Sequence, residues 1–424
     1  MIKEKVLAEK QFEAELIDSS KLFDQPEAVQ RQAENLKFKK TYFRRVLFQI
    51  HLWTGLLSGL LMAIFGVTGS LIVFHREQDD ALNAKLAFVN PPSAPHQTAP
   101  LQAIVDAAKR AQPDLKIQSV NLPSAPERSV MIQMRAAAGE QQRGEGAPSL
   151  SIYVNPYTAE VIGERDRNQT ALWWIRILHS NLHSGRTGRV IVGICGLLLA
   201  LLCLSGIVIW FPGRQNLKRG LTINRRANWK KLNWDLHSAI GFYSLILIFI
   251  IAITGSYYAW PQETLKGIYW VTNSAPRPEP PKSLKPEEQN ETIKLISIDD
   301  FLKTADAVLP NDRTTQIAFP VSPTGVLAIT KQPPAEVSSF LRSRVFLDQS
   351  SGAVLSVEDA REAPLGAKIA GLITPLHFGT IGGIWTRTLW LIVGLVLPLM
   401  FITGFLMWWN RVVRKRMRAP NNST

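Results

Sequence analysis

The sequence predicts a membrane protein whose fold is a four-span α-helical bundle, internally duplicated, with two small α+β domains on its outer side. The first observation is that four apolar runs exceed the roughly 20 residues that a helix needs to cross a bilayer core of about 30 Å. The second is that the chain repeats one set of motifs at fixed spacing, and the third is that a polar stretch separates the spans of each repeat. The apolar runs cover about 46–74, 189–211, 237–259 and 388–409.

Lysine and arginine are concentrated before the first span, between the second and third spans, and after the fourth. Positively charged residues stay on the cytoplasmic side of membrane spans, so this placement puts both termini and the middle loop in the cytoplasm. The net charge of +14 therefore reports orientation in the lipid bilayer. We expect no nucleic-acid partner.

The chain is expected to begin with a polar tail that is partly helical or disordered, and the first span then serves as its own anchor, because the run is far longer than that of a signal peptide. The expected order is cytoplasmic tail (1–41), first span (42–75), first outer domain (76–170), interfacial segment and second span (171–212), cytoplasmic basic loop (213–235), third span (236–260), second outer domain (261–365), interfacial segment and fourth span (366–410), and cytoplasmic basic tail (411–424).

Both outer stretches show the same order of elements. Residues 101–115, LQAIVDAAKRAQPDL, form an amphipathic helical pattern, and the runs that follow alternate as strands do. In the second stretch ISIDDFLKTADAVLP, residues 296–310, takes the helical place, and FLDQSSGAV can be laid over YVNPYTAEV. Each outer domain is therefore predicted to be one helix on a few antiparallel strands.

The outgoing spans are copies of one pattern. His51 and His237 each open a span, a glycine follows four residues on, and a Thr-Gly-Ser triplet begins seventeen residues on, at Thr68 and Thr254. The return spans agree as well, because His179 and His377 each stand 26 residues before a Ser-Gly or Thr-Gly pair and 31 before a tryptophan. Repeats in the same orientation imply a pseudo-twofold axis along the membrane normal.

Six of the seven histidines sit at span ends, and only His96 lies in a polar loop, where a surface role is expected. A twofold axis would bring His51 to His237 on the cytoplasmic side and His179 to His377 on the outer side. Two facing neutral imidazoles make an axial pair for a six-coordinate haem iron, and helical bundles hold such cofactors in their cores. The sequence therefore predicts two haems and a path for electrons across the membrane.

Other interpretations of these residues remain open. Gly55 and Gly59 share a helix face with His51, which would clear space for a flat macrocycle or would make notches for helix packing. Zinc or non-haem iron would want three or four converging ligands, and a proton relay would enlist acidic residues that the spans lack. Cys195 and Cys203, about 12 Å apart along one helix, are expected to be packing residues.

His75 and His183 have no counterparts, because the matching positions are Pro261 and Ile381. They could replace a symmetric ligand, bind a third group, face the substrate, or simply hydrogen-bond to water. Four arginines near the outer span ends could pair with haem propionates or extend to lipid headgroups. These are Arg176, Arg186, Arg189 and Arg387.

The motifs together, namely the HxxxG opening, the downstream Thr-Gly-Ser, the LHxxxxxG return spans and the VNPYTAEVIGERD segment, resemble the PepSY-associated transmembrane proteins of bacterial inner membranes. The resemblance covers about 42–412 and includes haem-containing ferrisiderophore reductases. It implies PepSY-like outer domains, an inner-membrane location and two b-type haems, with His51, His237, His179 and His377 at the matching motif positions.

The leading hypothesis is thus a ferric-siderophore reductase that takes electrons from a cytoplasmic or quinol donor and releases Fe(II) on the outer side. Reduction suits release, because hard-oxygen chelators hold Fe(III) far more strongly than Fe(II). One alternative is a quinol-linked haem protein with a protein acceptor. Another is a non-enzymatic regulator of the kind associated with inhibiting or binding peptidases.

Overall fold

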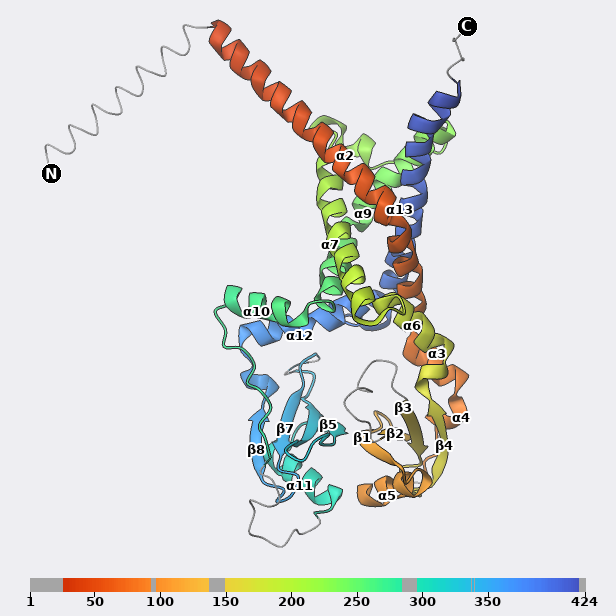
Figure 1. Ribbon diagram of the computed structural model, residues 1–424, viewed down its shortest axis with the longest axis vertical. Helices are drawn as coiled ribbons and strands as arrows, with labels where there is room; N and C mark the ends of the chain where they lie inside the picture. The colour runs from red at the N-terminus through yellow and green to blue at the C-terminus, as the bar shows by residue number, and fades with distance from the viewer. Residues whose placement is uncertain are drawn as a thin grey trace, which may run out of the picture. The chain divides into compact units, whose positions relative to one another are not determined.

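The computed structural model describes residues 26–92, 97–136, 149–283, 296–336, 338 and 340–418 (Figure 1). The beginning of the predicted polar tail and His96 lie outside these residues. The chain forms two compact units. One, called the tail unit here, comprises Met1–Leu60, Leu198–Ile246 and Leu399–Thr424, and the other, the lobe unit, comprises Leu61–Leu197 and Leu247–Pro398.

Within the described part of the chain, four helices are long and apolar enough to cross a membrane, and they contain the four predicted apolar runs almost completely. The first begins at Pro26, where the ring's fixed φ suits the first turn of a helix, so part of the predicted tail is helical. The apolar part of this helix starts at Thr41. The helices are α2 (Pro26–Ile72), α7 (Gly185–Trp210), α9 (Trp229–Tyr257) and α13 (Gly383–Arg418).

The strands of both predicted outer stretches belong to one antiparallel sheet of the lobe unit, with the order β4-β3-β2-β1-β5-β6-β7-β8. The two halves meet where β1 pairs with β5, and Val120 lies opposite Ile317 there. The strands are β1 (Leu115–Asn121), β2 (Val130–Ala136), β3 (Ser149–Val154), β4 (Val161–Asp166), β5 (Arg313–Ala318), β6 (Leu327–Gln332), β7 (Ser343–Leu347) and β8 (Val354–Glu358).

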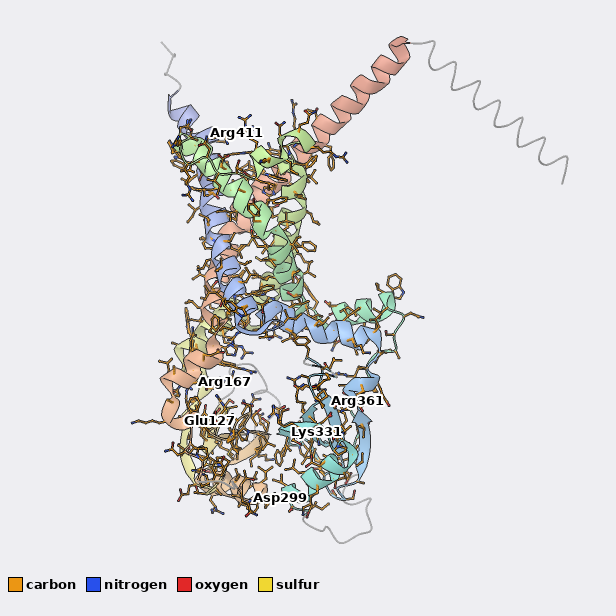
Figure 2. All side chains as sticks on the ribbon, turned by 180° about the vertical axis from the view of Figure 1, so that it is seen from behind. Glu127, Arg167, Asp299, Lys331, Arg361 and Arg411 are labelled. Atoms are coloured by element: carbon orange, nitrogen blue, oxygen red, sulfur yellow. The ribbon has the colours of Figure 1, made fainter. Side chains whose placement is uncertain are left out.

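One helix from each half packs on the sheet, and a single apolar core includes residues of both halves. These helices are α5 (Leu101–Ala111) and α11 (Ile298–Val308), as the amphipathic patterns predicted. Their first turns are linked, because the Asp299 carboxylate accepts hydrogen bonds from the backbone N–H groups of Leu101 at 2.8 Å and Gln102 at 3.0 Å (Figure 2). The Gln102 side chain accepts in turn from the Ile298 N–H at 3.0 Å.

Short helices connect the sheet to the spans. Two of them carry histidines in their last turns and end at residues in the left-handed conformation, Leu182 with φ 53° and Gly379 with φ 68°. These helices are α3 (His75–Leu82), α4 (Ala84–Ala87), η2 (Arg167–Gln169), α6 (Ala171–Asn181), α10 (Pro261–Val271), η5 (Ala360–Glu362) and α12 (Leu365–Phe378). Between the spans α7 and α9 the chain forms η3 (Arg214–Asn216) and α8 (Leu217–Gly220).

Candidate functional site

The lobe unit brings His179 of α6 and His377 of α12 together. Their ring centroids are 6.4 Å apart, and the ring planes are inclined by 47°. The left-handed residues that end α6 and α12 turn the chain at once into α7 and α13, so each imidazole stands where a short helix meets a span. The predicted outer pair is therefore present.

A hydroxyl group fixes the orientation of each of these rings. Nδ1 of His179 lies 3.0 Å from Oγ1 of Thr68, and Nδ1 of His377 lies 3.1 Å from Oγ1 of Thr254. Each hydroxyl donates its one hydrogen along its own helix, Thr68 to the Ile64 carbonyl at 2.7 Å. The imidazole Nδ1–H must therefore donate to the hydroxyl, which leaves the lone pair on Nε2, the nitrogen available to a metal.

The glycine of each Thr-Gly-Ser triplet makes room for the ring. A Cβ atom at Gly69 would lie 2.9 Å from Cε1 of His179, and one at Gly255 would lie 3.0 Å from Cε1 of His377. Atoms are rarely found so close, so a larger residue would push the imidazole aside. The short spacing explains why glycine follows threonine in both copies.

The serine of the triplet joins the spans to one another. Ser70 donates to the Leu391 carbonyl of α13 at 2.8 Å. The Ser256 hydroxyl is shared between the Ala252 carbonyl of its own helix at 2.9 Å and the Gly193 carbonyl of α7 at 3.2 Å. A serine hydroxyl that bonds across two spans requires a close approach of the helices. Within each triplet, the threonine thus bonds the histidine, the glycine leaves space for its ring, and the serine bonds the neighbouring span.

The tail unit repeats this arrangement around His51 and His237. Nδ1 of His51 lies 2.8 Å from Oγ of Ser205, and Nδ1 of His237 lies 2.8 Å from Oγ1 of Thr403. Ser205 donates to the Leu201 carbonyl at 2.7 Å, so this hydroxyl also accepts from the imidazole. Each of the two imidazoles is thus bonded to a hydroxyl of a return span, His51 to α7 and His237 to α13.

Glycines follow these two hydroxyl residues as well. A Cβ atom would lie 3.3 Å from Cε1 of His51 if added at Gly206, and 3.4 Å from Cε1 of His237 if added at Gly404. All four histidines therefore rest their Cε1 edge on a glycine. The sequence showed these Ser-Gly and Thr-Gly pairs as markers of the repeat, but their contact with histidine was not predicted.

The glycines near His51 on its own helix serve packing. A Cβ atom at Gly59 would lie 2.5 Å from the Phe401 ring, whereas one at Gly55 would lie 3.9 Å from Leu202. Of the two interpretations of this face, the notch for helix packing is the one seen at Gly59. The space beside His51 is defined instead by Gly206 of α7.

The two histidines without counterparts are not part of the pairs. His75 is half-buried, its Nδ1 bonds the Ile72 carbonyl at 3.0 Å, and its ring lies 6.5 Å from that of Phe378. His183 is exposed, and its Nε2 bonds the Trp174 carbonyl at 3.0 Å. Each of these two imidazoles thus has one ring nitrogen in a hydrogen bond to a backbone carbonyl.

The arginines differ in what occupies them. Arg387 forms an ion pair with Glu77, at 2.7 Å for one of the two contacts, and donates to the Val73 carbonyl at 2.7 Å. Its hydrogen bonds thus go largely to α3. Arg189 has a partner of its own, and Arg186 is exposed at the start of α7.

The residues fit a haem held by two imidazoles. A nitrogen lies about 2 Å from the metal that it binds and about 1 Å from its ring centre, so two axial imidazoles have centroids roughly 6 Å apart. The ring centroids of His179 and His377 are 6.4 Å apart, which agrees. Among the described residues, no three His, Cys, Asp or Glu side chains cluster in a way that could hold a metal ion. The buried indole Nε1–H of Trp390, whose ring lies close to Gly379, has no hydrogen-bond acceptor.

Comparison with known proteins adds two findings. The sequence profile of a family described as "PepSY-associated TM region" matches residues 48–411. An uncharacterized protein of Pseudomonas aeruginosa is similar to this chain, with 24% identity over 263 residues, which cover 58% of this chain and 64% of the relative. The match therefore spans a little less than two thirds of the relative's length.

Proposed function

This chain belongs to the family of the PepSY-associated TM region, and from that premise we propose that it is a di-haem oxidoreductase of the bacterial inner membrane that reduces a ferric siderophore. The observation that carries the proposal is the approach of His179 to His377, 6.4 Å between ring centroids, with both Nδ1 atoms held by hydroxyls. Four apolar helices make the chain a multi-pass membrane protein.

His179 with His377 would hold one haem b, and His51 with His237 would hold the other. When bound, haem supplies one-electron redox chemistry. The protein's own part is to keep each imidazole as the Nδ1–H tautomer, because the hydroxyl partners accept that proton. A fixed ring presents the same nitrogen in both oxidation states, which keeps reorganisation small during electron transfer.

The recurrence of these contacts supports the internal duplication proposed from the sequence. Ser205 and Thr403 stand at matching positions, and so do Thr68 and Thr254. The sheet supports it too, since its strand order is the same when read outward from the β1–β5 junction in either direction. The two halves of the sheet are then the two PepSY-like domains.

The orientation follows from the basic residues. Lysine and arginine gather at the ends of the spans that belong to the tail unit, so the positive-inside rule places those ends and both termini in the cytoplasm. The sheet then faces the periplasm, and electrons enter from a cytoplasmic or quinol donor. A ferric siderophore is then reduced on the sheet side. Reduction releases the iron because hard-oxygen ligands hold Fe(II) weakly.

The test begins with the haem content of the purified full-length protein, measured by the reduced-minus-oxidised optical spectrum and by haem extraction. The wild-type protein is expected to hold two haems per chain. His237→Ala and His377→Ala should each hold one haem, and the matched control His183→Ala should hold two. Absence of haem from the wild-type protein would instead favour a regulator without redox function.

The second step adds a ferric siderophore to the dithionite-reduced protein without oxygen. Reoxidation of the haem bands, together with Fe(II) captured by an Fe(II)-specific chelator, is the expected result. Reoxidation by a quinone or a protein acceptor, but not by ferric siderophores, would identify the chain as a quinol-linked electron carrier.

A further inference from the structure

The acidic side chains of α3 are all occupied by arginines. Glu77 pairs with Arg387, Asp79 with Arg165 at 2.7 Å, and Asp80 with Arg128 at 2.8 Å. Each pair is locally neutral. None of these three carboxylates is therefore free to neutralise further cations of the lobe unit, where α3, β4 and α6 lie near one another.

Three other arginines of the same region have no carboxylate partner among the residues that the structure describes. Arg167 and Arg176 both lie over the ring of Trp173, at 5.4 and 5.5 Å from its centroid, and Arg76 is exposed on α3. The nearest acidic residue in sequence, Asp166, uses its carboxylate to cap η2 through the Asn168 N–H at 2.9 Å. The three guanidinium groups thus leave an excess of positive charge.

The positive charges of these arginines act on His75. Burial lowers the pKa of His75, the hydrogen bond to the Ile72 carbonyl raises it, and the positive charges of Arg76, Arg176 and Arg167 lower it again. Arg167 is half-buried, and burial together with the charge of Arg176 lowers its pKa too. Figure 2 shows Arg167 beside α3. We call these three arginines and His75 the cationic patch.

Aromatic rings connect the cationic patch with His377. The ring of His75 lies 6.5 Å from that of Phe378, which meets His377 edge-on at 5.7 Å. Tyr258 lies beside both, 5.3 Å from His377 and 6.4 Å from Phe378. The ring of Phe378 thus lies between His75 of the patch and His377, a residue that the proposed function assigns to the haem.

We propose that the cationic patch is the docking site of the electron acceptor and that it selects an anionic ferric chelate, one whose iron is surrounded by carboxylate or catecholate oxygens. The proposal rests on the proposed function. Arginine forks bind such oxygens through paired, charge-assisted hydrogen bonds. A cationic chelate would meet repulsion from three like charges.

The carboxylates bound by these arginines could also be the propionates of a haem held between His179 and His377. The two sources share one chemistry but differ in consequence. Arginines that hold propionates are part of the haem site, so their loss would change haem content or potential. Arginines that hold a chelate would leave the haem unchanged.

The test uses gallium chelates, because Ga(III) resembles Fe(III) in charge and size and is not reduced under these conditions. Binding of gallium citrate, an anion, and of gallium desferrioxamine B, a cation, is measured by calorimetry on the full-length haem-loaded protein. The variants are Arg167→Gln and Arg176→Gln, with Arg167→Lys as the conservative change and Arg110→Gln, an exposed arginine on α5, as the control.

Gallium citrate is expected to bind the wild-type protein in preference to the cationic chelate. Each Gln variant should bind it about tenfold more weakly, as the loss of one charge-assisted hydrogen bond predicts. Arg167→Lys should retain part of the affinity, Arg110→Gln all of it, and haem content and midpoint potential should not change. Higher salt should weaken binding in the wild type more than in the variants.

Equal binding of the two chelates, or binding that is the same in all variants, would overturn the proposal. The proposal would also fail if the wild-type protein did not bind gallium citrate and the Gln variants lost haem or changed its midpoint potential. The arginines would then hold haem propionates. Arginine-dependent gallium binding without haem reoxidation would refute the proposed function alone. Reoxidation by ferric chelates that is independent of the arginines would refute only the docking site.

Discussion

His179 and His377 stand with ring centroids 6.4 Å apart although nearly two hundred residues separate them in the chain. Each is held by a threonine of the outgoing span of its own half, Thr68 or Thr254. The pair therefore depends on hydroxyls and glycines as much as on the histidines, and the predictions below address those supporting residues.

Removing the hydroxyl beside His377 should weaken haem binding. Thr254→Val keeps the shape of the side chain but loses the acceptor for Nδ1–H, so the ring can rotate or change tautomer. A fall in haem affinity of about 10- to 100-fold is expected from the loss of such an outer partner. Titration of the haem-depleted protein measures it. Thr254→Ser should retain binding, and Thr264→Val, whose hydroxyl also bonds a helix carbonyl, at 2.9 Å, is the control.

A methyl group at Gly69 should displace His179. The added Cβ would lie 2.9 Å from the imidazole, so Gly69→Ala is expected to lower the content of one haem and leave the other. Gly267→Ala places its Cβ in open space and should change neither. Haem content per chain is the measurement, and full occupancy in Gly69→Ala would contradict the role of this glycine.

The ion pair between Arg387 and Glu77 should make stability depend on pH. The hydrogen bond from Arg387 lowers the pKa of Glu77 from about 4.5 to about 2. The folded state thus prefers the ionised carboxylate, and this stabilisation is complete above pH 4.5 and is lost as the pH falls toward 2. Thermal unfolding of Glu77→Gln between pH 6 and pH 3 should fall less steeply than that of the wild type. Parallel curves would show that the pair does not affect stability.

The link between the two halves of the sheet should depend on Asp299. Asp299→Ala removes both hydrogen bonds to the first turn of α5, and loss of such a cap costs about 1–2 kcal/mol. A lower melting temperature and faster proteolysis of the sheet are expected. The control is Lys303→Gln on the same helix, because Lys303 makes an exposed pair with Asp300 whose contribution should be small.

Lys331 is fully buried beneath α11, where it pairs with Asp306 at 2.5 Å (Figure 2). Replacing a buried cation by an apolar residue of similar volume is often neutral or stabilising, so Lys331→Met should keep or raise the melting temperature. Asp306→Ala leaves the cation unpaired and should destabilise the protein by about 1–3 kcal/mol. The two changes are compared by thermal unfolding, and the opposite order of stability would refute this role of the pair.

The sequence contained most of the local structure. Apolar runs of sufficient length predict spans wherever they occur, and the amphipathic patterns at 101–115 and 296–310 predicted the helices α5 and α11. The fixed distance from His51 to Thr68, repeated from His237 to Thr254, marked residues of the candidate site. Such features depend only on neighbours in the chain, which is why they can be read without coordinates.

Contacts between distant segments needed the tertiary structure. Only the fold decides that Thr68 accepts from His179, that Gly59 is filled by Phe401, and that β1 joins β5 to make one sheet of two halves. The same holds for the pairing of the α3 carboxylates with Arg387, Arg165 and Arg128. Spacing along one helix fixes what each face offers, but which partner meets that face depends on how the other helices pack against it.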